Sequence, residues 1–162
     1  MKKIIPLLLL ITLTAEERTP ADFWYGMKME EKISFVNGVY AASSAIKAHH
    51  QRQVKEQYVR NDSWVRPYFI DRFYEIVDEH ISKEVDGHLD IVVLAVDALY
   101  SNSDNANIPV VEAIRIVSMV QDGNDQKANL YLLKAQRNNG QWFNDPSFCS
   151  SPYGEEYRWG NN

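Results

Sequence analysis

The chain has 162 residues, with 17 lysines and arginines against 22 aspartates and glutamates, and its formal net charge is −5. A chain of this length folds as one domain of ordinary size with its own core. Nucleic-acid phosphates and anionic lipid head groups repel an acidic chain unless it carries a strong basic patch, and Glu56 interrupts the densest basic run, residues 47–60. Nucleic acid therefore ranks low among possible partners.

Residues 1–15 have the pattern of an export signal. Two lysines precede an apolar run, residues 4–13, which is followed by Thr14 and Ala15. The run is too short to span a bilayer, which takes about 20 residues, whereas a basic start and an apolar centre are what the export machinery reads. We therefore predict a signal peptide over residues 1–15, a periplasmic or secreted protein, and no stable membrane anchor after cleavage. A short buried helix or a retained anchor is the alternative.

The helical domain is predicted over residues 16–140. Thr19, Pro20 and Asp22 have the order of a helix start, and Gly26 ends that first turn. A long helix then begins near Met29. Its far half, residues 51–60, is mostly polar and is expected to project towards solvent or a partner. The apolar stripe of its near half is Ile33, Val36, Val39 or Tyr40, Ser43 and Ile46.

Apolar residues every three to four positions predict further helices over residues 68–86, with Gly87 as the stop, and over residues 89–100. The second segment is rich in β-branched residues and also resembles a buried strand, but its length favours helix. After an Asn-rich loop, residues 101–107, Asn107 is expected to cap a helix with Pro109 in its first turn. A last helix covers residues 125–137. The fold class is therefore all-α, a single bundle of four to five helices.

The segment 141–162 is expected to be an irregular aromatic tail. It holds six aromatic residues among prolines, glycines and serines, without a period, whereas disordered tails are usually poor in aromatics. We expect part of it to lie against the helices or against a partner. Its Cys149 is the one cysteine of the chain, so it is either a free thiol or paired with another chain.

Large amphipathic rings are the best candidates for a binding surface, because such rings dominate binding hot spots. The alternative for Trp24 and Trp64 is that they plug the ends of the bundle. The candidates are Trp24, Tyr58, Trp64, Trp142, Tyr153 and Trp159.

No catalytic residue, cofactor or metal site is predicted. His49 and His50 are adjacent, so on a helix their rings point about 100° apart and cannot share a metal. His80 and His88 lack visible partner ligands. The acids of the predicted helix 68–86 are interpreted as a solvated face opposite Phe73 and Val77. They are Asp71, Glu75, Asp78 and Glu79.

A scattered set of residues resembles a pattern found in small exported helical proteins of uncharacterised role. The set comprises Trp24, Glu31-Lys32, Phe35 to Tyr40, Asp97 to Tyr100, Asn105 and Ile108-Pro109. Its first part also resembles the helical immunity proteins that protect the periplasm from secreted amidase toxins. Those proteins commonly carry cysteine pairs, which this chain lacks. Neither resemblance supplies a catalytic residue.

The same positions have structural interpretations. Gly38 costs about 1 kcal/mol against alanine in mid-helix, so it is expected to let another helix approach closely. We expect Tyr100 to pack under the Asn-rich loop, and we count Asn105 and Pro109 with it as structural residues. Asp97 is expected to accept hydrogen bonds from the start of the following helix.

These observations favour an exported binding, inhibitor or immunity-type protein that acts through protein–protein contacts, with another protein or with itself. A small exported hydrolase, with a site assembled from carboxylates or histidines, is the main alternative. A structural envelope component with Tyr58 and Trp64 at its self-contact is the second. A binder should expose an apolar patch, whereas an enzyme should have a pocket holding two or more ionisable side chains.

Overall fold

The computed structural model describes residues 18–61 and 63–137. These residues form six α-helices and one 3-10 helix, with no strand among them, which confirms the all-α prediction. The predicted leader, residues 1–15, and the predicted tail, residues 141–162 with Cys149, lie outside the described residues. The elements are α1 (Pro20–Tyr25), α2 (Met29–Arg60), α3 (Tyr68–Asp78), α4 (Leu89–Tyr100), η1 (Ser103–Asn105), α5 (Val110–Gln121) and α6 (Asp125–Arg137).

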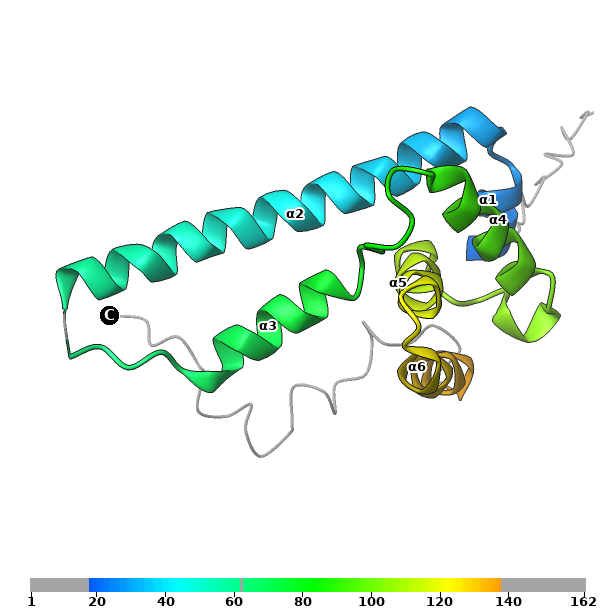
Figure 1. Ribbon diagram of the computed structural model, residues 1–162. Coiled ribbons are helices and arrows are strands. Elements are labelled where there is room, and N and C mark those ends of the chain that lie inside the picture. Colours follow the sequence, from blue (N-terminus) through cyan, green and yellow to red (C-terminus); the bar gives the residue numbers. More distant parts are fainter. Residues whose placement is uncertain (1–17, 62, 138–162) are drawn as a thin grey trace, which may run out of the picture.

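The long helix α2 connects two parts of the molecule (Figure 1). Its first half packs on α4, which packs on α5, and α5 packs on α6 and α1; we call this assembly the body. Its second half extends from the body, as the sequence predicted for residues 51–60, and α3 lies alongside it. We call residues 47–78 the arm.

The starts of the first two helices are as predicted. Thr19 Oγ1 accepts a hydrogen bond from the Asp22 amide at 3.1 Å, and the Asp22 carboxylate accepts one from the Thr19 amide at 3.0 Å. This reciprocal cap satisfies amide groups that have no partner inside the helix. Its hydrogen bonds lower the pKa of Asp22. Gly26 caps the end of α1, and α2 begins at Met29.

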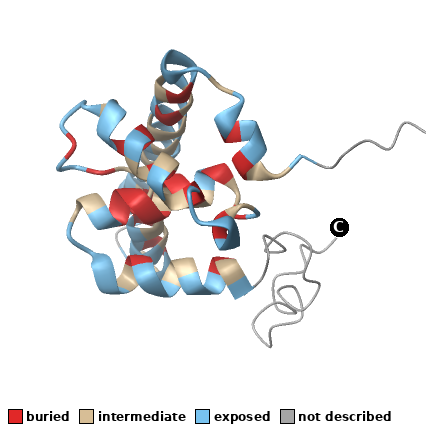
Figure 2. Ribbon diagram, turned by 90° about the vertical axis from the view of Figure 1, so that its right-hand side faces the viewer, coloured by how far each residue is buried: buried red, intermediate tan, exposed pale blue. Residues whose placement is uncertain are grey.

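The core of the body is built from β-branched residues of α4 and α5 around Trp24 and Val36, which are fully buried. Figure 2 shows these buried residues in red where the helices meet. Val92, Val93 and Val96 lie on the buried face of α4, so the segment 89–100 is a core helix and the strand alternative is excluded. The predicted stripe of α2 is wrong at its end, because Ile46 is 56% exposed.

Two predicted helix boundaries are wrong. The helix α3 ends at Asp78 and not at residue 86: the amides of His80 and Ile81 bond three positions back, and distant groups take the amides of residues 82–84. The Tyr40 hydroxyl accepts from the Ser82 amide at 3.1 Å, and Asp122 accepts from the Lys83 amide at 2.9 Å. In α5, Pro109 is the residue that caps the helix, in place of Asn107, and the helix begins at Val110.

The predicted structural residues divide into confirmed and corrected ones. Tyr100 is buried and donates to the Ile108 carbonyl at 2.6 Å, as expected under the loop. Asn105 is buried and donates to the Leu99 carbonyl at 2.7 Å. The interpretation of Gly38 is wrong, because it is exposed and, apart from its chain neighbours and the backbone of its own helix, no heavy atom lies within 4 Å of where its Cβ would stand.

Candidate functional site

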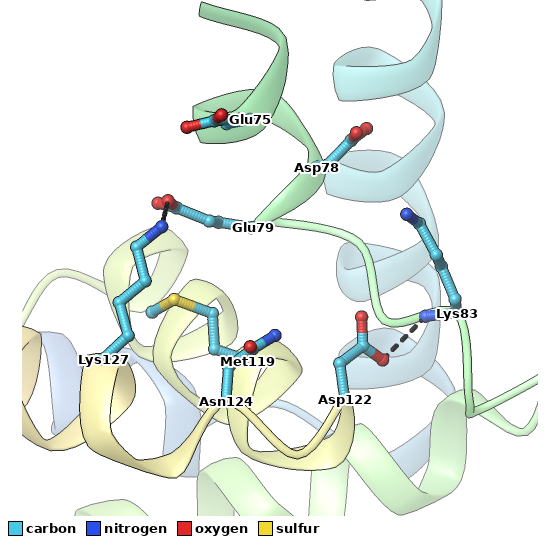
Figure 3. Close-up of a pocket in the computed structure, with 8 residues that line it drawn as sticks. All are labelled: Glu75, Asp78, Glu79, Lys83, Met119, Asp122, Asn124 and Lys127. Carbon is cyan, nitrogen blue, oxygen red and sulfur yellow. Dashed lines mark hydrogen bonds and ion pairs between the residues drawn. The ribbon is translucent and has the colours of Figure 1, made fainter. Parts of the chain in front are cut away.

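A pocket lies where the end of α3 meets the turn between α5 and α6 (Figure 3). It encloses about 210 Å³, below the roughly 300–1,000 Å³ of typical ligand sites. It has the ionisable lining that the hydrolase alternative requires. The lining residues are Glu75, Asp78, Glu79, Lys83, Met119, Asp122, Asn124 and Lys127.

Glu79 is the central acid of this pocket, and the structure overturns its interpretation as a solvated residue. Its side chain is 7% exposed. Arg115 donates its Nε to Glu79 Oε2 at 2.9 Å and also contacts it through Nη2. Lys127 Nζ lies 2.5 Å from Oε1, reaching in from α6 as Figure 3 shows. Arg72 Nη1 adds a third cation at 3.6 Å. Glu79 therefore joins α3, α5 and α6.

The charge state of Glu79 follows from these contacts. Burial by itself raises the pKa of a carboxyl group, but the hydrogen bonds from Lys127 and Arg115 outweigh it and lower the pKa of Glu79. A general acid near neutral pH needs the opposite, a raised pKa. Glu79 is thus a fixed anion that holds three helices together, and it is a poor proton donor.

The other acids of the pocket are also engaged. The carboxylate of Asp78 lies 2.5 and 2.7 Å from Lys47 Nζ, and Glu75 lies 2.8 Å from Arg72. Asp122 accepts from Ser82 Oγ at 2.7 Å and from the Lys83 amide. These bonds fix the segment that follows α3, so the pocket is a junction between helices.

The histidines have structural contacts as well. His80 Nδ1 lies 2.8 Å from the Ile76 carbonyl, and burial lowers the pKa of His80. His50 lies 3.0 Å from the Tyr74 hydroxyl, so it is half-buried against α3, while His49 is exposed. Within residues 18–61 and 63–137, no group of three or more His, Cys, Asp or Glu side chains is placed to hold a metal ion.

Asp97 links helices, but they are not the helices that the sequence predicted. It accepts from Trp24 Nε1 at 2.6 Å and from Lys32 Nζ at 2.7 Å, and not from the start of α5. The Lys32 ammonium also lies over the Trp24 ring, 5.2 Å from its centroid. This cluster ties α1, α2 and α4 together. The structure therefore brings together Trp24, Lys32 and Asp97, which all belong to the set that resembles small exported helical proteins.

Two of the predicted binding residues meet on the arm. The rings of Tyr58 and Trp64 are perpendicular, with centroids 4.7 Å apart. Tyr58 is 43% exposed and Trp64 is half-buried. Trp24, by contrast, is fully buried, so it plugs the body and does not contribute to a surface. Trp142, Tyr153 and Trp159 lie outside the described residues.

A groove runs beside Tyr58 between α2 and α3, and we call it the arm groove. Its lining residues are Gln51, Val54, Lys55, Tyr58, Arg66 and Tyr74. The α2 residues lie three to four positions apart, so they share one helix face. Arg66 lies over the Tyr74 ring, 5.3 Å from its centroid. Its Nε atom is buried and has no hydrogen-bond partner among the described residues.

Sequence reasoning missed two features of these sites. Glu79 carries no local signal, because its cations Arg115 and Lys127 come from helices 36 and more positions away. The basic run 47–60 looked interrupted, but the fold brings Arg66 to the groove that Lys55 lines. None of the helices in the described part of the chain has the length and apolar character needed to cross a bilayer.

Comparison with known proteins adds no assignment, because no protein-family model, no curated protein and no solved structure matches the chain.

Proposed function

We propose that the protein is an exported binding module of the inhibitor or immunity type, which acts through protein–protein contacts made by its arm. The observation that carries the proposal is the arm groove, with Val54, Tyr58 and Tyr74 along it and two cations beside them. Aromatic and arginine side chains around a small hollow are the usual composition of a binding hot spot.

The chemistry of the groove indicates what a partner would present. The groove encloses about 250 Å³, which suits one anchoring side chain rather than a whole small molecule. The free Nε of Arg66 needs an acceptor, because a buried donor without a partner costs about 1–3 kcal/mol. An apolar side chain followed by a carboxylate or carbonyl oxygen would meet both requirements.

The hydrolase alternative has less support. The pocket carboxylates are bound to Lys47, Arg72, Arg115 and Lys127 or to backbone amides, and the pKa of Glu79 is lowered. A hydrolytic site needs an acid or base that is free to exchange a proton with substrate. The proposal that the protein works in the periplasm or outside the cell rests on residues 1–15.

The test is a pull-down from the envelope fraction of the source cells with the exported chain as bait, beside two matched variants. Val54→Arg adds bulk and a further cation to the groove, while Leu94→Arg makes the same kind of change at an exposed position of α4. We expect one stoichiometric partner with the wild type and with Leu94→Arg, and its loss with Val54→Arg.

Two results would count against the proposal. One is the absence of any stoichiometric partner, and the other is equal recovery with Val54→Arg. Light scattering on the purified chain distinguishes the structural alternative, because a homo-oligomer that Val54→Arg dissociates would make the arm a self-contact. Melting curves of both variants show whether each is folded.

A further inference from the structure

The end of the arm carries the most protruding apolar side chains of the described residues. Among the large apolar residues there, Tyr68 is 86% exposed, Val65 82% and Val59 78%. Phe69 is exposed beside them. We call these four residues the arm tip. Side chains this exposed are placed to contact another surface, and Val59 also lines an open hollow on α2 with Arg52, Lys55 and Arg60.

Basic residues surround the arm tip, although the molecule is acidic. Residues 51–69 hold four lysines and arginines and two acids, a net charge of +2. The described residues outside this segment hold ten basic and fifteen acidic side chains, a net charge of −5. Asp71, the next acid along α3, is paired with Arg66, and with this acid included residues 51–71 have a net charge of +1. Charge is thus segregated towards the end of the arm.

The length of α2 keeps the acidic body away from whatever the arm tip touches. A helix of 32 residues is about 48 Å long, and the arm tip lies at its far end from the body (Figure 1). Charges in water are screened over about 10 Å at 0.1 M salt. An anionic surface at the arm tip therefore interacts with the basic segment and hardly with the acidic body.

We infer that the arm tip is a peripheral docking site for an anionic phospholipid surface. Val59, Val65 and Phe69 insert at the boundary of head groups and acyl chains, where Tyr68 and Trp64 sit at the interfacial level that such rings prefer. Arg60, whose side chain is 74% exposed and lies 4.0 Å from the Glu56 carboxylate, meets the lipid phosphates. An exported protein meets such a surface on leaving the membrane.

Other occupants fit the arm tip less well. Two arm tips facing each other would bring two positive segments together, which disfavours a second copy of the chain. A nucleic-acid backbone would satisfy the arginines but leave the protruding valines in water. A protein pocket for several separate protruding residues is the remaining alternative, and the experiment distinguishes it. The docking site goes beyond the proposed function, which uses the arm groove.

Binding is measured by co-sedimentation of the exported protein with vesicles of phosphatidylglycerol and phosphatidylethanolamine, and with vesicles of phosphatidylcholine alone. We expect binding to the anionic vesicles only, weakened by added salt. The double variant Val59→Ser/Val65→Ser should lower the partition coefficient about tenfold, because two exposed apolar side chains no longer insert. Arg60→Glu should lower it about tenfold through reversed charge.

Matched controls lie on the body. Leu133→Ser and Lys134→Glu change an exposed apolar and an exposed basic residue of α6, and should leave vesicle binding unchanged. A label reports orientation: an environment-sensitive dye on Val65→Cys in a Cys149→Ser background should brighten on anionic vesicles. The same dye on Leu133→Cys should not change.

The inference is overturned if the anionic vesicles fail to bind the protein, if they bind the double variant as well as the wild type, or if the dye at position 133 responds in place of the dye at 65. It is also overturned if the tip variants lose the protein partner of the pull-down yet keep vesicle binding, since the arm tip would then be a protein surface. If Val54→Arg loses the protein partner and the tip variants keep it, that result concerns the arm groove only. The vesicle measurements then test the arm tip separately.

Discussion

Glu79 is the residue whose environment differs most from what its sequence neighbours suggest. One carboxylate on a polar helix face is buried among three cations that arrive from α3, α5 and α6. A periodicity argument places a residue on a face of its own helix, but it cannot show that another helix covers that face. The positions of Arg115 and Lys127 follow from the packing of the body.

Replacement of Glu79 by glutamine should lower the free energy of unfolding by about 2 kcal/mol at pH 7, because two or more partly buried cations lose their counter-charge. Glu75→Gln, on the exposed side of the same helix, should change it by less than about 0.5 kcal/mol. Urea unfolding of the three proteins measures both effects. Equal small effects would mean that the Glu79 pairs contribute nothing.

The effect of Glu79 should also depend on pH. Its pKa in the folded protein lies below the ordinary value of 4.5, so its stabilisation is present above that value and is lost as pH falls through the folded pKa. The difference in unfolding free energy between wild type and Glu79→Gln should therefore be constant near neutrality and shrink below pH 4.5. A difference that grows on acidification would contradict the lowered pKa.

Gly38 provides a second test at this scale. It is exposed in mid-helix with open space around it, so Gly38→Ala should raise the free energy of unfolding by about 1 kcal/mol. Gly87 is the matched contrast, because its φ of +86° strains any residue with a Cβ, and Gly87→Ala should destabilise the protein. Thermal unfolding compares the two. A destabilising Gly38→Ala would restore the close-approach interpretation.

At the scale of elements, the sequence predicted the boundaries that depend on nearby residues and missed two others, the start of α5 and the end of α3. The Thr19 cap and the beginning of α2 depend on residues within one turn, so the sequence contains them. After α3 ends, the amides of residues 82–84 bond to Tyr40 and Asp122, which lie about 40 positions away and compete with continued helix. Such competition is visible only after the helices have packed.

The Asp97 cluster should be a measurable link between α1, α2 and α4. Asp97→Asn removes the charge that faces Lys32, whose side chain is 10% exposed, and should cost about 2 kcal/mol of unfolding free energy. Lys32→Met in the same chain should recover part of this loss, giving a coupling energy above about 0.5 kcal/mol in a double-mutant cycle. Asp90→Asn on the exposed face of α4 is the control. Strict additivity would show that the pair does not interact.

The two halves of α2 should differ in local stability. The first half is packed against the body, whereas in residues 51–60 only Val54 is half-buried and all other residues are exposed. Opening free energies are low where few apolar contacts hold an element. Hydrogen exchange should therefore be faster in residues 51–60 than in residues 30–40. Equal protection along the helix would contradict the division into body and arm.

For the whole molecule, the sequence predicted the helical class and the projecting half of α2, and it singled out Tyr58 on that half and Trp64 just beyond it. It did not predict that α3 would lie along that half and form the arm groove, because the groove needs Arg66 and Tyr74 from one helix region beside Val54 and Tyr58 from another. The separation of a basic arm end from an acidic body was not predicted either. The net charge of the chain sums over both parts, and only the fold places them apart.

The proposal that the arm groove binds a protein partner is tested in intact cells by a photo-reactive p-benzoylphenylalanine in place of Tyr58, with the same residue in place of Leu133 as the control. We expect irradiation to give one discrete crosslinked product from position 58, none from position 133, and loss of the product when Val54→Arg is added. No product from position 58, or the same products from both positions, would contradict a partner at the arm groove.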